Sequence, residues 1–144
     1  MIGYDNQIIR LKKNTDFRLV WSSGKKKISD NLILIYVKNS QKYTRVGISS
    51  VKNYGNSVQR NKITRRVRSI MRNTNILHGN DIVIMARKKS KESKFSIIEE
   101  ELNRLLTSAG LTSRWKTNKT NEIYININNK VLASNLTTPD PLEI

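Results

Sequence analysis

The apolar positions of the chain form three runs with the length and composition of β-strands. Residues 31–37 (NLILIYV) are almost continuously apolar and rich in β-forming residues, which is typical of a strand covered on both faces. Residues 45–51 (RVGISSV) predict a second strand, antiparallel to the first across a polar turn, and residues 81–86 (DIVIMA) predict a third. Lys25, Lys26 and Lys27 are expected to form a basic turn before the first strand.

Three other segments follow the 3.6-residue period of an amphipathic helix. Residues 16–21 predict a short helix that begins near Asn14 or Thr15 and ends at Gly24. Residues 58–72 predict a second helix, with a candidate cap in the segment 55–57. The apolar stripes of these two helices are Phe17, Val20 and Trp21 in the first, and Ile63, Val67 and Ile70 in the second.

The last predicted helix begins at Ser96, where Ser96 and Glu99 have the spacing of a capping box. It is expected to end before Gly110, which stands where a left-handed residue commonly terminates a helix. Its predicted buried stripe consists of Ile98, Leu102, Leu105, Leu106 and Ala109.

The order of elements over residues 10–111 is therefore α-β-β-α-β-α, which predicts an α+β fold with a single mixed β-sheet and helices packed on it. Residues 1–111 are expected to form one domain. Residues 112–144 are rich in Asn and Thr and contain both prolines, so we expect a polar, mobile tail. Within this tail, residues 122–127 (EIYINI) alternate and offer an added strand.

The strong positive charge of the chain indicates a polyanionic partner. The formal net charge is +16 and the isoelectric point is about 10.4. Residues 1–111 contain 23 Lys and Arg and 8 Asp and Glu, a net charge of +15. Self-repulsion at this charge destabilises an isolated compact chain, so a polyanionic partner is expected. Nucleic acid is the first candidate, an anionic membrane the second, and a basic protein without a nucleic-acid partner the remaining alternative.

The composition of the chain also indicates the cellular compartment in which the protein is expected. The chain contains no cysteine, which excludes disulfides and cysteine zinc sites and suits a reducing cytosol. It has no apolar run of the roughly 20 residues that span a bilayer, and its first residues lack the order of a signal peptide. We expect a soluble cytoplasmic protein without a membrane partner.

The second predicted helix carries the strongest functional signal. At 100° per residue, its cations fall in a narrow sector opposite the apolar stripe. No Asp or Glu occurs between Asp30 and Asp81, so these like charges lack local acidic partners. Phosphates would relieve their repulsion, because guanidinium groups pair with phosphate through two parallel hydrogen bonds. The sector consists of Asn61, Arg65, Arg68 and Arg72, flanked by Arg60, Lys62 and Arg66.

Three aromatic residues favour RNA over DNA, because single-stranded RNA recognition commonly stacks unpaired bases on aromatic rings. These residues are Phe17, Trp21 and Tyr36. The competing interpretation is that each belongs to the core, and Tyr36 is the most ambiguous because both faces of its strand look apolar.

The segment around the second predicted helix resembles a known protein family. Residues 45–68 (RVGISSVKNYGNSVQRNKITRRVR) resemble the signature of the bacterial ribonuclease P protein, and residues 10–24 and 81–88 are similar to its flanking segments. The resemblance covers about residues 8–111. Departures include Asn53, where a second lysine is usual, and Lys62, which keeps the charge of the usual arginine but lacks its planar fork.

The resemblance implies a ribosomal protein S5 domain 2-like fold with a left-handed βαβ crossover. It also implies a protein without catalytic residues, whose partners are the ribonuclease P RNA subunit and the 5′ leader of precursor tRNA. The RNA subunit would perform the cleavage with Mg²⁺ held mainly by RNA and substrate. The residues matching the RNA-binding positions are Lys52, Arg60, Asn61, Lys62, Arg65, Arg66 and Arg68, continued by Arg72, and those matching the leader cleft are Phe17, Trp21 and Tyr36.

Two alternatives remain. A ribosomal or translation-associated protein would share the charge but not the leader contacts. An intrinsic protein nuclease would need clustered carboxylates or a histidine pair. The only histidine, His78, is expected in a surface loop, and the consecutive Glu99, Glu100 and Glu101 are expected to serve a helix N-terminus. Neither a protein metal site nor a small-molecule substrate is predicted.

Overall fold

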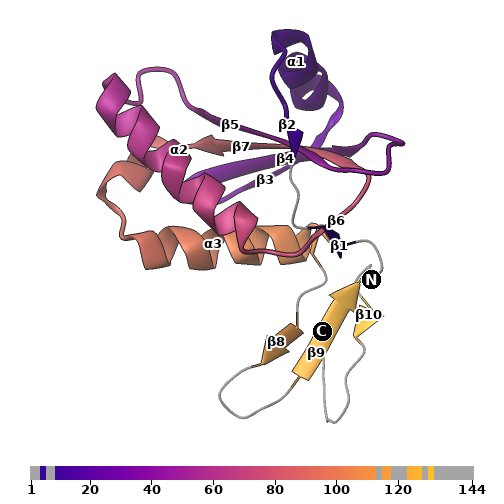
Figure 1. The fold of residues 1–144 in the computed structure, drawn as a ribbon. Coiled ribbons are helices and arrows are strands. Elements are labelled where there is room, and N and C mark those ends of the chain that lie inside the picture. Colours follow the sequence, from indigo (N-terminus) through magenta and orange to yellow (C-terminus); the bar gives the residue numbers. More distant parts are fainter. Residues whose placement is uncertain (1–3, 6–8, 113–114, 118–122, 128–129, 132–144) are drawn as a thin grey trace.

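A five-stranded mixed sheet, with helices on both faces, forms the body of the protein (Figure 1). The computed structural model describes residues 4–5, 9–112, 115–117, 123–127 and 130–131. The single mixed sheet with packed helices confirms the predicted α+β class.

The central strand of this sheet is β7 (Asn80–Ala86), which is apolar on both faces. On one side it pairs antiparallel with β4 (Leu32–Lys38), and β4 pairs antiparallel with the edge strand β3 (Lys25–Ile28). On the other side it pairs parallel with β5 (Arg45–Ser50), which pairs parallel with the short edge strand β2 (Ile9–Arg10). The strand order is therefore β2-β5-β7-β4-β3.

The strands β4 and β5 run antiparallel to each other as predicted, because β4 is antiparallel and β5 parallel to β7. They are not hydrogen-bonded neighbours, however, because β7 lies between them. The parallel connection from β5 through a helix to β7 brings the strand with the most buried residues into the centre, where both faces are covered. Lys25–Ile28 is a strand rather than a basic turn. An edge strand exposes one side to water, so lysines are tolerated there and discourage pairing with other chains.

The helices divide between the two faces of the sheet. Helix α1 (Asn14–Ser23) lies on one face, over a small core formed by Leu11, Val20, Ile35 and Val83. Helices α2 (Ser57–Arg72) and α3 (Phe95–Ser108) lie on the other face, over the larger core (Figure 1). A short 3₁₀ helix, η1 (Lys88–Glu92), joins β7 to α3.

Helix ends show where local sequence decides the structure. Asn56 caps α2 in a complete capping box with Gln59, so the cap predicted in this segment is confirmed. The other predicted caps are wrong: α1 begins after Lys13 and α3 after Lys94, neither with a side-chain cap. Gly110 has φ +73°, as its position after the last helix predicted.

Short strands accompany the main sheet. Strand β1 (Tyr4–Asp5) pairs with β6 (Ile76–Leu77). Strand β9 (Ile123–Ile127) confirms the strand predicted in the tail, and it pairs with β8 (Trp115–Thr117) and β10 (Lys130–Val131). Thr112, the first tail residue, is buried and forms an isolated antiparallel bridge with Ile76. Residues 113–114, 118–122, 128–129 and 132–144 lie outside the described part, and the domain boundary at residue 111 stays a prediction. In the described ranges, no helix is long and apolar enough to cross a bilayer.

Candidate RNA interface

Helix α2 presents its cations on the side away from the sheet. Its apolar stripe, Ile63, Val67 and Ile70, is almost completely buried against the larger core. The predicted functional side chains of the opposite side are exposed or half-buried, and within the described part of the chain none is paired with a carboxylate. Exposed are Arg60, Asn61, Lys62, Arg65 and Arg72, and half-buried are Arg66 and Arg68.

The tertiary structure divides these cations between the two flanks of α2. On one flank, Arg68 and Arg72 face Arg10 and Lys12 across a hollow of about 490 Å³, here called the α1–α2 groove. Its apolar walls include Leu11, Phe17, Val46, Ile48 and Met71. Partial burial, followed by the nearby positive charges of Arg10 and Arg72, lowers the pKa of Arg68. An anion in the groove would oppose both effects, because it would pair with the charged form of Arg68.

On the other flank, Lys62 and Arg66 face η1 across a smaller hollow of about 120 Å³, the α2–η1 notch, which also contains Lys91. Arg65 lines neither hollow and is exposed on the helix between them. The predicted basic face is therefore one ridge with a hollow on each flank, and sequence periodicity alone does not reveal that arrangement.

A third hollow, of about 380 Å³, lies between α1 and the sheet and is here called the α1 cleft. Phe17 and Trp21 line it together with Val83 and Met85. Phe17 and Ile48 line both the α1 cleft and the α1–α2 groove, so the two hollows adjoin around the side of β5 that β2 leaves uncovered. An apolar, aromatic cleft adjoining a cationic groove offers separate surfaces for bases and for phosphates.

The position of Phe17 depends on a glycine that the sequence reasoning did not single out. A Cβ at Gly47 of β5 would lie 2.5 Å from Cζ of Phe17 and 2.7 Å from its Cε1. The ring therefore packs directly on the strand backbone. The only sequence signal was a glycine in the interior of a strand, which commonly marks a close approach of this kind.

Tyr36 does not share the cleft with the other two aromatic residues. It is half-buried and packs on the larger core, beside its cross-strand partner Ile82. Successive residues of a strand point to opposite faces, so Tyr36 lies on the α2–α3 side while Ile35 faces α1. The expectation that Phe17, Trp21 and Tyr36 form one cleft is therefore wrong for Tyr36.

The Trp21 side chain is partly exposed to solvent and contacts a lysine. Its side chain is 43% exposed, and Nζ of Lys26 lies 4.9 Å from the ring centroid. The same ammonium group donates a 2.8 Å hydrogen bond to the carbonyl oxygen of Trp21 near the end of α1. A cation at the C-terminal end of a helix interacts favourably with the helix dipole. Lys26 therefore connects the edge strand β3 to Trp21, one of the residues that line the α1 cleft.

A partly buried ionic network joins α1 to the sheet. Arg45 on β5 donates two hydrogen bonds to Asp81 on β7, at 2.9 Å and 2.6 Å, and lies 3.4 Å from Asp16 on α1. Asn39 also donates a 2.8 Å bond to Asp81. Burial raises the pKa of Asp81, but the bonds from Arg45 and Asn39 outweigh it and hold that pKa below its ordinary value. The bond to Asp81 raises the pKa of Arg45.

Lys52 is exposed on the tight turn that precedes α2. Its neighbour Asn53 has φ +63°, a left-handed conformation that asparagine adopts more readily than most residues. Farther along, Nη1 of Arg60 donates a 2.6 Å bond to the carbonyl oxygen of Gly55. The turn thus directs Lys52 into solvent beside the first turn of the basic helix.

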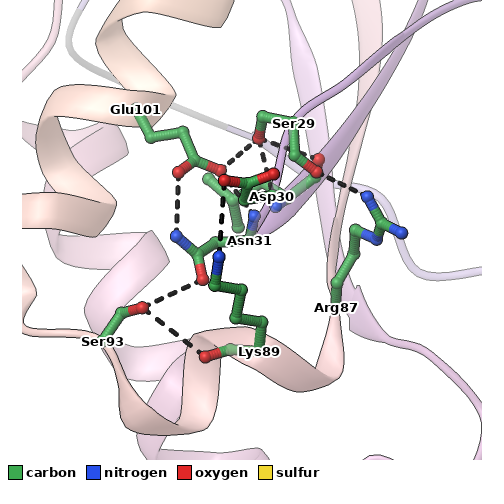
Figure 2. Close-up of polar contacts among 8 residues, drawn as sticks. Ser29, Asp30, Asn31, Arg87, Lys89, Ser93 and Glu101 are labelled. Carbon is green, nitrogen blue, oxygen red and sulfur yellow. Dashed lines mark hydrogen bonds and ion pairs between the residues drawn. The ribbon is translucent and has the colours of Figure 1, made fainter.

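Glu101 is buried, which corrects its expected role at the N-terminus of α3. Its carboxylate accepts hydrogen bonds from the backbone and side chain of Asn31, both 2.8 Å, and from the hydroxyl of Ser29 (Figure 2). The same cluster includes Ser93, whose hydroxyl donates to Asn31. It joins α3 and η1 to the turn between β3 and β4. Glu99 is half-buried and Glu100 is exposed.

Comparison with known proteins identifies the family. A family model described as Ribonuclease P matches residues 6–110, which include α1, the sheet, α2 and η1. The chain belongs to the ribonuclease P protein family. The predicted resemblance is thereby confirmed.

Relatives and solved structures agree. The ribonuclease P protein component of Streptococcus agalactiae serotype III is 36% identical over 103 residues, covering 71% of this chain and 94% of the relative. The RNase P protein of Thermotoga maritima has a TM-score of 0.62 at 35% identity, over 67% of this chain and 94% of that one. A Staphylococcus aureus RNase P protein mutant with defective mRNA degradation activity has a TM-score of 0.66 at 31% identity, over 71% and 88%.

Among the residues that the structure describes, no three His, Cys, Asp or Glu side chains gather in a group that could hold a metal ion. Asp16 and Asp81 both contact Arg45, so their oxygens already have a cationic partner.

Proposed function

We propose that this chain is the RNA-binding protein subunit of ribonuclease P and assists a catalytic RNA subunit in removing the 5′ leader of precursor tRNA. One observation carries the proposal: the ridge of cations on α2 borders the α1–α2 groove, and the aromatic α1 cleft adjoins that groove. Family membership supports the assignment.

The two surfaces have different roles in this proposal. The α2 cations, with Lys52 on the preceding turn, bind RNA phosphates, which guanidinium and ammonium groups pair with regardless of sequence. Phe17 and Trp21 receive unpaired bases of the leader in the α1 cleft. Arg68, Arg72 and Arg10 hold the adjoining leader phosphates. Tyr36 has no part in leader binding.

Cleavage is assigned to the RNA. Mg²⁺ bound mainly by the RNA subunit and the substrate supplies the activated water. The protein residues bind, orient and neutralise charge, so that the negatively charged substrate and RNA subunit approach each other with less repulsion.

Reconstitution tests the proposal. The protein is combined with a ribonuclease P RNA at low Mg²⁺, and leader removal from precursor tRNA is measured. Leader removal should be stimulated with both components, and absent with the protein alone. A second arm incubates the protein alone with mRNA, because one similar protein is a S. aureus RNase P protein mutant with defective mRNA degradation activity. Lack of stimulation would overturn the proposal, and mRNA cleavage by the protein alone would add an activity of its own.

Replacing two α2 cations tests the binding surface. Arg65→Ala with Arg68→Ala should weaken binding to the RNA subunit or to precursor tRNA about tenfold or more at moderate salt. Each lost phosphate contact should also reduce the slope of log affinity against log salt by roughly 0.7–0.9.

The matched control is Lys38→Ala with Lys42→Ala, which removes the same charge from the exposed end of β4 and the loop that follows it, outside α2. If both double variants lost affinity equally, net charge rather than the α2 ridge would carry binding.

A further inference from the structure

The α2–η1 notch combines cations from two elements that are separate in sequence. Lys62 and Arg66 come from α2, and Lys91 comes from η1, the segment that joins β7 to α3. Gln59 and the buried Tyr54 complete the wall around a hollow of about 120 Å³. No acidic side chain lines the notch in the described part of the chain. Glu92 follows Lys91 in sequence but is exposed outside the lining.

The η1 wall is held in place by buried hydrogen bonds. The hydroxyls of Tyr54 and Ser90 lie 2.7 Å apart, and both residues are 1% exposed. Ser90 also donates a 2.8 Å bond to the carbonyl oxygen of Arg87. On the α2 side, Nη1 of Arg66 donates a 3.2 Å bond to the carbonyl oxygen of Ser93, just after η1. These contacts fix the two walls relative to each other.

Lys91 itself is oriented by Tyr54. Its Nζ lies 5.6 Å from the centroid of the Tyr54 ring, within cation–π distance. A lysine normally loses considerable side-chain freedom when it binds a ligand, and partial ordering beforehand reduces that cost. The contact with Tyr54 thus holds the ammonium group at the notch beside Lys62 and Arg66, although the three positive charges repel one another.

We propose that the α2–η1 notch binds a phosphodiester group of an RNA backbone, with Lys62, Arg66 and Lys91 as its donors. η1 is then a second wall of the RNA-binding surface, on the opposite flank of α2 from the α1–α2 groove. The inference rests on the proposed function and deepens it, because it assigns Lys91, a residue outside the basic helix. The phosphodiester can come from the RNA subunit or from the precursor tRNA leader.

The test compares Lys91→Ala with Lys42→Ala in the full-length protein. Lys42 is a matched control because it is an exposed lysine in the loop after β4, at the opposite end of β4 and β7 from η1. Affinity for the ribonuclease P RNA subunit is measured between about 50 mM and 200 mM NaCl. Affinity of the reconstituted complex for precursor and mature tRNA is measured in parallel.

Lys91→Ala should weaken one of these affinities about threefold to tenfold and reduce its salt slope by roughly 0.7–0.9, the value for one phosphate contact. Lys91→Arg should restore most of the loss. A change in RNA-subunit affinity assigns the phosphate to that RNA, and a change confined to precursor tRNA assigns it to the leader. Thermal unfolding of each variant separates lost contacts from lost folding.

Equal affinities and salt slopes for Lys91→Ala and Lys42→Ala would overturn the notch proposal. That failure is distinguishable from failure of the proposed function, in which the wild-type protein itself would neither bind the RNA subunit nor stimulate leader removal.

Discussion

Single residues set the geometry of the α1 cleft. Gly47 allows the ring of Phe17 to lie on the backbone of β5, and Asp81 holds Arg45 where it also reaches Asp16 of α1. Neither Gly47 nor Asp81 is a predicted RNA contact. Both fix the position of the helix that carries Phe17 and Trp21, so their replacement should alter the cleft without removing any residue that lines it.

Gly47→Ala should displace the Phe17 ring, because the new methyl carbon would lie 2.5 Å from Cζ. Overpacking of this kind costs about 1–3 kcal/mol of folding free energy. Denaturant unfolding measures that cost, and the preference for precursor over mature tRNA should fall with it.

A double-mutant cycle identifies the cause. Adding Phe17→Leu to Gly47→Ala should recover part of the lost stability, although Phe17→Leu alone is destabilising. If the two losses were simply additive, the clash with the ring would not explain the effect.

Asp81→Asn should lower stability at neutral pH by roughly 1–3 kcal/mol, because the ionised acceptor of Arg45 is lost. The native pKa of Asp81 lies below its ordinary value. Its contribution is therefore complete above the unfolded-state pKa of about 3.9 and disappears as pH falls through the native pKa.

The difference between wild type and Asp81→Asn, followed by unfolding at several pH values, should shrink below about pH 4. The control is Asp30→Asn, since Asp30 is exposed and lies 3.4 Å from the exposed Lys89. A difference that persisted unchanged at strongly acidic pH would contradict the assigned network.

At the scale of elements, Glu101 joins three segments that have no common sequence pattern. It fixes the turn between β3 and β4 against α3, and through Asn31 and Ser93 it reaches the end of η1 (Figure 2). The same η1 forms one wall of the α2–η1 notch. The packing of α3 and the position of Lys91 are thus connected through one buried carboxylate.

Glu101→Ala should destabilise the protein by about 2–3 kcal/mol, because it leaves the buried backbone and side-chain N–H donors of Asn31 without their acceptor. Glu100→Ala is the matched control: Glu100 is exposed and makes only a 3.9 Å contact with Arg104. Equal unfolding midpoints for the two variants would show that the cluster contributes no stability.

At the scale of the whole molecule, the net charge of +16 opposes the compact state. The α2 ridge, the α1–α2 groove and the α2–η1 notch concentrate part of that charge around one helix. Arg68 illustrates the cost, since partial burial and then the like charges of Arg10 and Arg72 lower its pKa. An RNA partner relieves this repulsion and should stabilise the native fold.

The unfolding midpoint of the free protein should therefore rise as NaCl is raised, because salt screens repulsion between exposed charges. Saturating ribonuclease P RNA at low salt should raise it further, by the stabilisation that any ligand selective for the native state provides. A midpoint that fell with added NaCl would show that repulsion does not limit stability. Thermal scans at fixed protein concentration make the comparison.

The sequence by itself determined the features that depend on local spacing and composition. The apolar stripe and the basic face of α2 follow from the 3.6-residue period, and the α+β class follows from the succession of periodic segments. The residues around Lys52 and Arg60 carried the family resemblance, which the family match over residues 6–110 confirmed. Such features need no knowledge of distant neighbours.

Tertiary structure alone decided which faces meet. Strand order placed β7 between β4 and β5, and the pleat of β4 turned Tyr36 away from Phe17. Packing brought Arg10 to Arg68 and buried Glu101 against the turn at Asn31. The physical reason is that periodicity fixes the side of an element on which a residue lies, whereas its neighbours there depend on contacts between segments far apart in the chain.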